Sequence, residues 1–233
     1  ILEAGISITE NGTRWTDLED REHDQGQHDE LKDVLAVSSA GMLIKRSLFE
    51  ELGGFDPSLE LFRDDIDLGW RARIAGHSVI CVGEAILYHA EAASSERRTV
   101  DVRDAILHRP LLLDRRNAAF VLLVNSSWWI LPWVAIQLLF TSIGRSIIYL
   151  LAKLPGYAAD EVAAVALLIF KPADLIKSRR FRKSSKVLTA RVIKPFIPSR
   201  NLQIRAIMER ISSSLTNAFK PNRFDGEITR ARN

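Results

Sequence analysis

The sequence of 233 residues predicts an α/β fold in its first part, followed by a mainly α-helical region that associates with a membrane. Three observations lead to this prediction. Residues 61–89 combine an amphipathic helix with short apolar strands, residues 118–143 carry no charge, and the net charge changes along the chain. It is −9 for residues 1–117, zero for residues 118–170 and +12 for residues 171–233. Three compositions indicate three segments: an acidic globular part, an apolar middle and a basic tail.

Short elements are expected before the acidic cluster. Residues 1–8 alternate weakly between apolar and polar, and the Asn-Gly dipeptide at positions 11 and 12 is typical of a hairpin turn. Residues 34–44 form an apolar run with small residues in its middle, which would let a ligand or another backbone come close. Residues 45–52 are expected to form a short helix that ends at a Gly-Gly pair.

The stretch from residue 61 to residue 89 organises the first part of the chain. Ile66, Trp70 and Ile74 recur with the spacing of one buried helix face, and Gly76 stands where this helix would end. Residues 78–82 are then predicted as a buried strand, and a second short apolar run ends at His89.

Three aspartates, Asp64, Asp65 and Asp67, stand at the start of this predicted helix. A carboxylate at a helix N-terminus is held ionised by the helix dipole, which keeps it available as a base. The simpler interpretation is that the aspartates only cap the helix. One acid is enough for capping, and three close together repel one another, so the cluster favours a catalytic site.

The segment AGMLIKRSLFEELGGFDPSL, the RDDID helix start and the Tyr-His pair that ends at position 89 together resemble the second half of the catalytic domain of family 2 glycosyltransferases. The resemblance covers residues 34–89, with a looser fit from Ile1. It implies that residues 1–98 are the C-terminal part of a GT-A domain. In detail the chain resembles actinobacterial cell-envelope enzymes that carry a membrane-associated C-terminal part.

The resemblance implies a role for each candidate residue. Asp65 falls on the family's catalytic base, and Asp64 would support it. His89 would hold a divalent cation, Mn²⁺ or Mg²⁺, unless it is merely a strand-end histidine bonded to backbone. Arg97 and Arg98 would face donor phosphates if their segment closes over the donor, and otherwise form a solvated loop. The expected substrate-binding residues are Gly41, Met42, Asp67, Arg97 and Arg98.

Two family motifs are not found. The Asp-x-Asp donor motif has no counterpart in residues 1–60 and is expected upstream of Ile1. The chain is therefore expected to be a piece of a longer protein and inactive as an isolated fragment. The Gln-x-x-Arg-Trp signature of processive relatives is absent too, which favours the addition of one or a few sugars.

The rest of the chain is predicted to contact a membrane. Residues 99–117 would form an amphipathic connector, and residues 118–170 apolar helices that either cross the bilayer an even number of times or enter it shallowly. Residues 171–233 would form a basic, helical, cytoplasmic tail against anionic lipid. The basic cluster in it comprises Lys177, Arg179, Arg180, Arg182, Lys183 and Lys186. Nucleic acid is not an expected partner, because no zinc motif or pattern of interleaved aromatic residues is present.

These features predict an inverting hexosyl- or pentosyltransferase of cell wall or polysaccharide biosynthesis. It would transfer a sugar from a nucleotide-sugar donor to an envelope glycan or a polyprenyl-linked acceptor. Its location would be the inner membrane, with the catalytic part facing the cytoplasm; the single cysteine, which rules out a disulfide framework within the chain, fits that side. The alternative is a non-catalytic membrane adaptor that keeps the glycosyltransferase shape.

Overall fold

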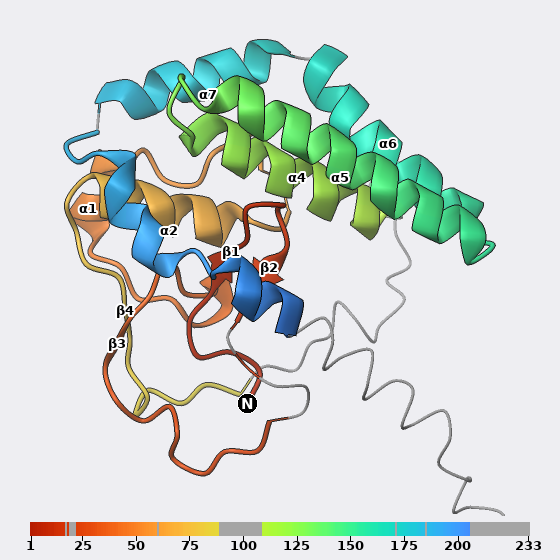
Figure 1. The fold of residues 1–233 in the computed structure, drawn as a ribbon. Coiled ribbons are helices and arrows are strands. Elements are labelled where there is room, and N and C mark those ends of the chain that lie inside the picture. Colours follow the sequence, from red (N-terminus) through yellow and green to blue (C-terminus); the bar gives the residue numbers. More distant parts are fainter. Residues whose placement is uncertain are drawn as a thin grey trace, which may run out of the picture. The chain divides into compact units, whose positions relative to one another are not determined.

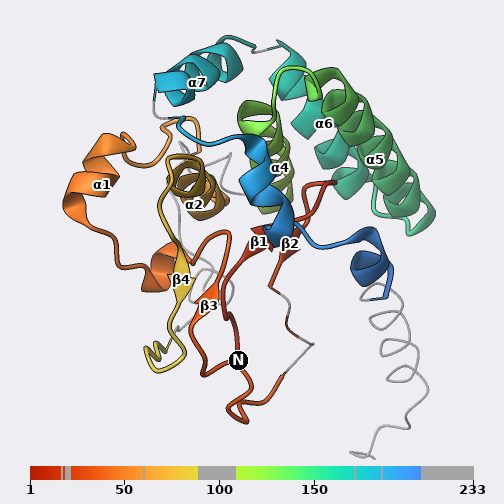
Figure 2. The ribbon, with the colours of Figure 1, turned by 60° about the vertical axis from the view of Figure 1, so that its left-hand side comes forward.

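The computed structural model describes residues 1–16, 18, 22–59, 61–88, 109–170, 172–184 and 186–205. The chain divides into two compact units, Ile1–Ile197 and Pro198–Asn233. The helices and strands named below belong to the first unit, which Figures 1 and 2 show from two directions. Among the described residues, strands and helices are mixed up to residue 81, and helices alone follow from residue 110. The coarse prediction of an α/β part followed by a helical region is confirmed, although the strands are few and short.

The first two strands form a tight hairpin. β1 (Ser7–Ile8) and β2 (Arg14–Trp15) pair antiparallel, with Ile8 opposite Arg14. Gly12 in the turn has φ +84°, a left-handed conformation that glycine adopts without strain. The hairpin predicted from the Asn-Gly dipeptide is therefore confirmed.

A second pair of strands forms a separate small sheet (Figure 2). β3 (Lys32–Asp33) pairs antiparallel with β4 (Ile80–Cys81). The prediction of a buried strand at residues 78–82 is wrong, because Ile80 is 51% exposed and Val82 is 39% exposed. Two strands of two residues each have too few neighbours to bury their apolar side chains.

The segment between β3 and the acidic cluster contains two short helices. They are the 3₁₀ helix η1 (Ser39–Gly41) and the α-helix α1 (Arg46–Glu51). α1 confirms the helix predicted at residues 45–52. Gly53 and Gly54, at φ +75° and +70°, follow it and turn the chain.

The helix α2 (Asp64–Ile74) is buried on more than one side. Ile66, Trp70 and Ile74 are all buried in the main hydrophobic core, so the helix face predicted from their spacing is confirmed. Leu68 and Ala72 lie on another face and pack in a smaller cluster.

α2 also lies against the backbone of a neighbouring segment. A Cβ atom at Gly69 would be 2.5 Å from the carbonyl oxygen of Leu35, so only glycine lets the helix come this close. The helix ends as predicted at Gly76, which has φ +94°, and the N–H of His77 donates to the carbonyl of Ala72 at 3.0 Å.

The uncharged segment at residues 118–143 is divided between two helices. α4 (Pro110–Asn125) ends inside it, and α5 (Leu131–Leu151) begins after a turn. The second half of α4 is buried in the same core as Ile66, through Ala118, Ala119, Phe120, Val121, Leu122 and Val124. The predicted boundary between a connector at residues 99–117 and membrane helices at residues 118–170 falls inside α4.

Two polar features of the sequence explain this division. The Asn125 side chain donates to Asp67 on α2 at 2.9 Å, which ties the end of α4 to the α/β part. Pro132 occupies the first turn of α5, where its missing N–H costs no helical hydrogen bond, so it begins a helix and does not kink one.

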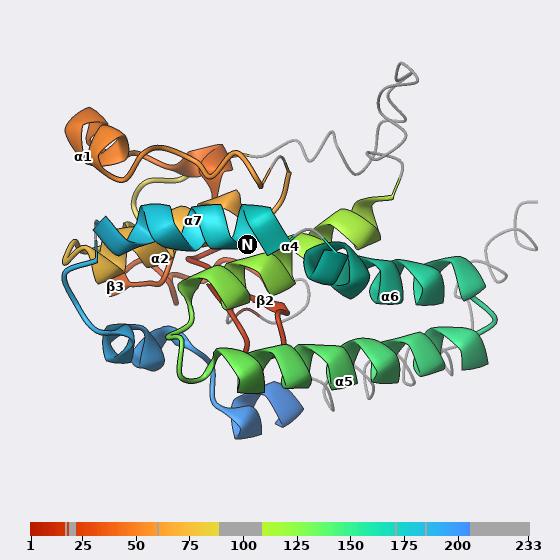
Figure 3. The same cartoon turned by 90° about the horizontal axis from the view of Figure 1, so that it is seen from above.

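The remaining helices fold back on the earlier ones. α6 (Pro155–Phe170) packs along both α5 and α4, and Figure 3 shows α5 and α6 side by side. α7 (Pro172–Ser184) packs on α4, and the 3₁₀ helix η3 (Ala190–Phe196) packs on α2. The N–H of Leu188 donates to the carbonyl of Ile74 at 2.8 Å. The segment from α7 to η3 is thus part of the first unit, and the predicted basic tail from residue 171 includes this segment.

One described helix, α5, is long and apolar enough to cross a membrane, judged by length and composition alone. Most of its surface is exposed. Length and composition are weak grounds, because core helices of soluble proteins satisfy the same criteria.

Candidate active site

The acidic cluster lies on a strained turn at the start of α2. Asp64, Asp65 and Asp67 all belong to the first turn of the helix, as the sequence predicted. The two residues before them, Phe62 and Arg63, have φ of 63° and 68°. Bulky residues rarely adopt this left-handed conformation, which costs about 1–3 kcal/mol each and persists only where the surroundings enforce it.

Side chains of α4 enforce this turn. The guanidinium of Arg63 is buried and forms a two-point ion pair with Asp114, from Nε to Oδ1 at 2.7 Å and from Nη2 to Oδ2 at 3.0 Å. Asn117 donates through Nδ2 to the carbonyl oxygens of Leu61 and Phe62. The first half of α4 therefore fixes the backbone that presents the acidic cluster.

Asp65 is almost completely buried, with 5% of its surface exposed. The N–H of Ile66 donates to its Oδ1 at 2.7 Å, and Nη2 of Arg14 lies 3.9 Å from its Oδ2. Burial raises the pKa of the Asp65 carboxyl above its usual value; Arg14 and the Ile66 N–H lower this pKa in part, while Asp64 raises it by charge repulsion. From the sequence, the helix terminus is expected to favour the ionised form of Asp65, but the pKa is raised because burial is the largest effect.

A buried carboxylate with a raised pKa is a stronger proton acceptor than an exposed aspartate. Arg14 on β2, the cation that the described residues place near Asp65, also pairs with Glu3. Asp65 is thus suited to remove a proton from a neutral hydroxyl group. Arg14 can stabilise the negative charge of the Asp65 carboxylate before that transfer.

Asp67 is fully buried and binds three side chains from three helices. Arg71 on α2 donates to its Oδ2 at 2.8 Å. Asn125 on α4 and Arg182 on α7 donate to its Oδ1 at 2.9 and 2.6 Å. We call Asp67, Arg71, Asn125 and Arg182 the α2 anchor. These contacts give Asp67 a structural role, and its predicted contact with substrate stays a prediction.

The other predicted residues either have no described contact with Asp65 or lie outside the described residues. Gly41 is exposed and lies beside Leu87, which is close to the end of the described range 61–88. Met42 is half-buried and packs in the smaller cluster with Leu68. The predicted residues His89, Arg97 and Arg98 lie outside the described residues.

The described residues do not contain three His, Cys, Asp or Glu side chains placed to hold a metal ion. The predicted ligand His89 is not among them. A cation site therefore stays a prediction, and no residue in the described part of the chain is assigned to it.

The structure adds residues to the site that sequence reasoning missed. Arg14 lies 51 positions before Asp65, and Arg182 lies 115 positions after Asp67. No periodicity or motif links residues so far apart in the chain. The one available signal was Asn125, a polar residue within an otherwise apolar segment, which points to a buried hydrogen-bond partner.

Comparison with known proteins places the acidic cluster inside a family segment. Residues 11–103 match the family described as glycosyltransferase like family 2. The match includes β2, α1, α2 and β4 and ends before α4, so Asn125 and Arg182 of the α2 anchor lie outside it. The acidic cluster is thus part of a glycosyltransferase family 2-like segment.

Three relatives are similar to parts of this chain. The O-antigen biosynthesis protein RfbC of Myxococcus xanthus is 33% identical over 79 residues, 34% of this chain and 6% of that protein. The N-acetylglucosaminyl-diphospho-decaprenol L-rhamnosyltransferase of Mycobacterium tuberculosis is 31% identical over 98 residues, 41% of this chain and 29% of that protein. The uncharacterized protein y4gI of Sinorhizobium fredii is 42% identical over 60 residues, 25% of this chain and 7% of that protein.

The matched segments thus span less than a third of each of these relatives. No solved structure matches the chain.

Proposed function

We propose that this chain carries the acceptor-side half of an inverting family 2 glycosyltransferase with a GT-A fold. The observation that carries the proposal is the position of Asp65. It is a buried carboxylate of raised pKa, it follows a strained turn, and it lies within the segment that matches the glycosyltransferase family. Asp64 would support Asp65 by its charge, and Asp67 would support it through the α2 anchor.

In the proposed reaction, Asp65 takes the proton of the acceptor hydroxyl as its oxygen attacks the anomeric carbon of the donor sugar. The bond from that carbon to the diphosphate oxygen breaks, and the nucleoside diphosphate leaves with the bonding electrons. Attack from the side opposite the leaving group inverts the configuration. A divalent cation held by His89 would neutralise the negative charge on the departing diphosphate.

We propose further that the donor is a nucleotide sugar and that the acceptor is an envelope glycan or a polyprenyl-linked sugar at the cytoplasmic face of the inner membrane. The names of two relatives support this, one an O-antigen biosynthesis protein and the other a transferase acting on a decaprenol-linked sugar. The exposed apolar surface of α5 supports a location at a membrane.

The experiment that tests the function uses the full-length protein in native membrane vesicles. Radiolabelled UDP-, GDP- and dTDP-sugars are supplied one at a time, and the label in the lipid and glycan fractions is measured. We expect one donor to label one of these fractions. Vesicles with the Asp33→Asn variant, which changes an exposed aspartate away from the cluster, should behave like the wild type. No transfer from any donor class would favour the non-catalytic adaptor.

A further inference from the structure

The helix α5 has a buried face that contains two serines and an exposed face that is apolar. Its buried residues are Leu138, Ser142 and Ser146, spaced four apart along one face. Large apolar side chains follow the opposite face, each at least 43% exposed: Trp133, Ile136, Phe140, Ile143, Ile147, Leu150 and Leu151. A surface helix of a soluble protein has the reverse pattern. We call this set of seven residues the outer face of α5.

The inner face of α5 joins α6 through small polar residues. Ser142 Oγ donates to the carbonyl of Glu161 at 2.7 Å, and Ser146 Oγ donates to the carbonyl of Ala158 at 2.9 Å. In lipid, apolar side chains gain little free energy by packing together, because the acyl chains around them are equally apolar. Helices there typically pack through small residues and serine-to-backbone hydrogen bonds.

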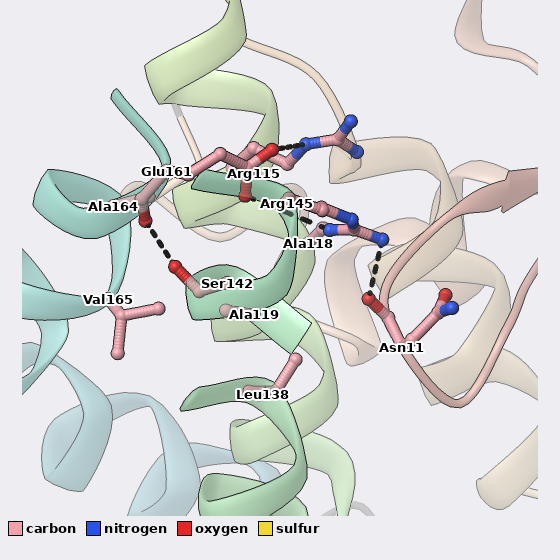
Figure 4. A pocket seen from close by; sticks show the side chains of 10 residues that line it. All are labelled: Asn11, Arg115, Ala118, Ala119, Leu138, Ser142, Arg145, Glu161, Ala164 and Val165. Atoms are coloured by element: carbon pink, nitrogen blue, oxygen red, sulfur yellow. Dashed lines mark hydrogen bonds and ion pairs between the residues drawn. The ribbon is translucent and has the colours of Figure 1, made fainter. Parts of the chain in front are cut away.

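The charges of this helix pair are also turned inward (Figure 4). Glu161 on α6 is 1% exposed, pairs with Arg115 of α4 at 2.7 Å and lies 3.9 Å from Arg145 of α5. Asp160 pairs with Arg109. The cavity of about 20 Å³ between these helices is too small for a sugar and holds at most a water molecule. The charged residues thus connect α5 and α6 to α4 and leave the outer face apolar.

Arg145 also shows how α5 lies relative to the α/β part. Its Nη2 donates to the carbonyl of Asn11 at 3.3 Å and to Oγ1 of Thr13 at 3.0 Å, both in the β1–β2 turn. Arg145 comes 14 residues after Leu131, which is about 21 Å along the helix axis.

A bilayer crossing by α5 is incompatible with this contact. The hydrocarbon layer is about 30 Å thick. If α5 spanned it from Leu131, the β1–β2 turn would be carried deep into the hydrocarbon together with Arg145. Lipid-exposed turns do not occur at that depth, and this turn presents an exposed charged residue, Glu10.

We propose that α5 and α6 lie in the plane of one membrane leaflet, with the outer face of α5 among the acyl chains, and do not cross the bilayer. Trp128 and Trp129 are exposed just before α5, and Lys153 is exposed just after it. Indole rings suit the headgroup level, and a lysine suits anionic phospholipid, so both ends of the helix carry interfacial anchors. This attachment does not depend on sugar transfer.

Flotation with vesicles of phosphatidylethanolamine and phosphatidylglycerol tests the lipid contact. We expect the full chain to float with the vesicles and the Phe140→Glu and Ile147→Glu variants to lose at least tenfold in bound fraction. Leu43→Glu changes an apolar residue of the α/β part that is even more exposed, and it should float like the wild type. Circular dichroism confirms that each variant is folded. Unchanged flotation of both outer-face variants would overturn the proposal. It would also be overturned if the wild type did not bind vesicles and instead formed a dimer that Phe140→Glu dissociates.

Labelling with a membrane-impermeant maleimide tests the absence of a crossing. Two single-cysteine variants are made in the Cys81→Ser background: Lys153→Cys at the α5–α6 turn and Ser47→Cys on the exposed side of α1. In sealed vesicles the reagent should label both from the same side of the membrane. Labelling of the two variants from opposite sides would show that α5 crosses and would overturn the proposal.

Discussion

At the scale of single residues, two opposing influences act on the carboxyl group of Asp65. Burial raises its pKa, and the guanidinium of Arg14, 3.9 Å away, lowers it in part. Glu3 competes for the same guanidinium and raises the pKa by its own charge. The strength of Asp65 as a base therefore depends on a residue of β2 that lies far from it in the sequence.

The Arg14→Gln substitution is expected to shift the pH dependence of sugar transfer. Without the positive charge, the pKa of Asp65 rises further, since burial, Asp64 and Glu3 all act in that direction. The base must be deprotonated to work, so the acidic limb of the plot of kcat/KM against pH should move to higher pH. Arg46→Gln, at an exposed ion pair on α1, should leave the limb in place. An unchanged limb in Arg14→Gln would mean that Asp65 is not the group that titrates.

At the scale of elements, the α2 anchor joins helices from three parts of the chain. Arg182 donates to Asp67 at 2.6 Å and to Asp56 at 2.7 Å, and its side chain is 7% exposed. Arg182→Met leaves two buried carboxylates with fewer donors, which costs about 3–5 kcal/mol. Urea unfolding should show this loss, whereas Arg180→Met on the exposed side of α7 should stay within about 0.5 kcal/mol of the wild type. Equal midpoints for both variants would show that the anchor contributes no stability.

Two helical glycines should respond in opposite directions to alanine. At Gly69 on α2 a Cβ would overlap the carbonyl oxygen of Leu35 at 2.5 Å, and such crowding costs about 1–3 kcal/mol. At Gly144 on α5 nothing lies within 4 Å, so alanine should stabilise by up to about 1 kcal/mol through helix propensity. Thermal unfolding in the same buffer compares the two. A stabilised Gly69→Ala would disprove the close packing of α2.

Local patterns in the sequence were sufficient to predict several elements. The Asn-Gly turn, the helix at residues 45–52 and the buried face of Ile66, Trp70 and Ile74 depend on neighbours within one or two turns. A strand was predicted at residues 78–82 and β4 lies within it, but its burial was predicted wrongly, because the burial of an apolar run depends on what packs on it. The end of α4 was missed for a similar reason, since the partner of Asn125 is Asp67 on another helix.

At the scale of the whole molecule, the segment that matches the glycosyltransferase family is supported by helices beyond it. α4 fixes the turn before Asp64 through Asp114 and Asn117, and α7 contributes Arg182 to the α2 anchor. The sequence predicted the acidic cluster as the candidate site. It could not predict these supports, because they are contacts between segments more than 50 positions apart. α4 and α7 are therefore expected to position the proposed base, while α5 and α6 are proposed to contact the membrane.

The most direct test of the proposed function is single-turnover sugar transfer by the full-length protein carrying Asp65→Asn. Transfer should fall by about 10²–10⁴-fold, the usual contribution of a general base, while donor binding stays unchanged. Because burial raises the pKa of Asp65 in the folded chain, the ionised carboxylate lowers stability at pH 7, and the neutral asparagine should unfold at the same or a higher urea concentration. Asp33→Asn serves as the matched control. A folded Asp65→Asn variant that transfers sugar within tenfold of the wild-type rate would contradict the assignment of Asp65 as the base.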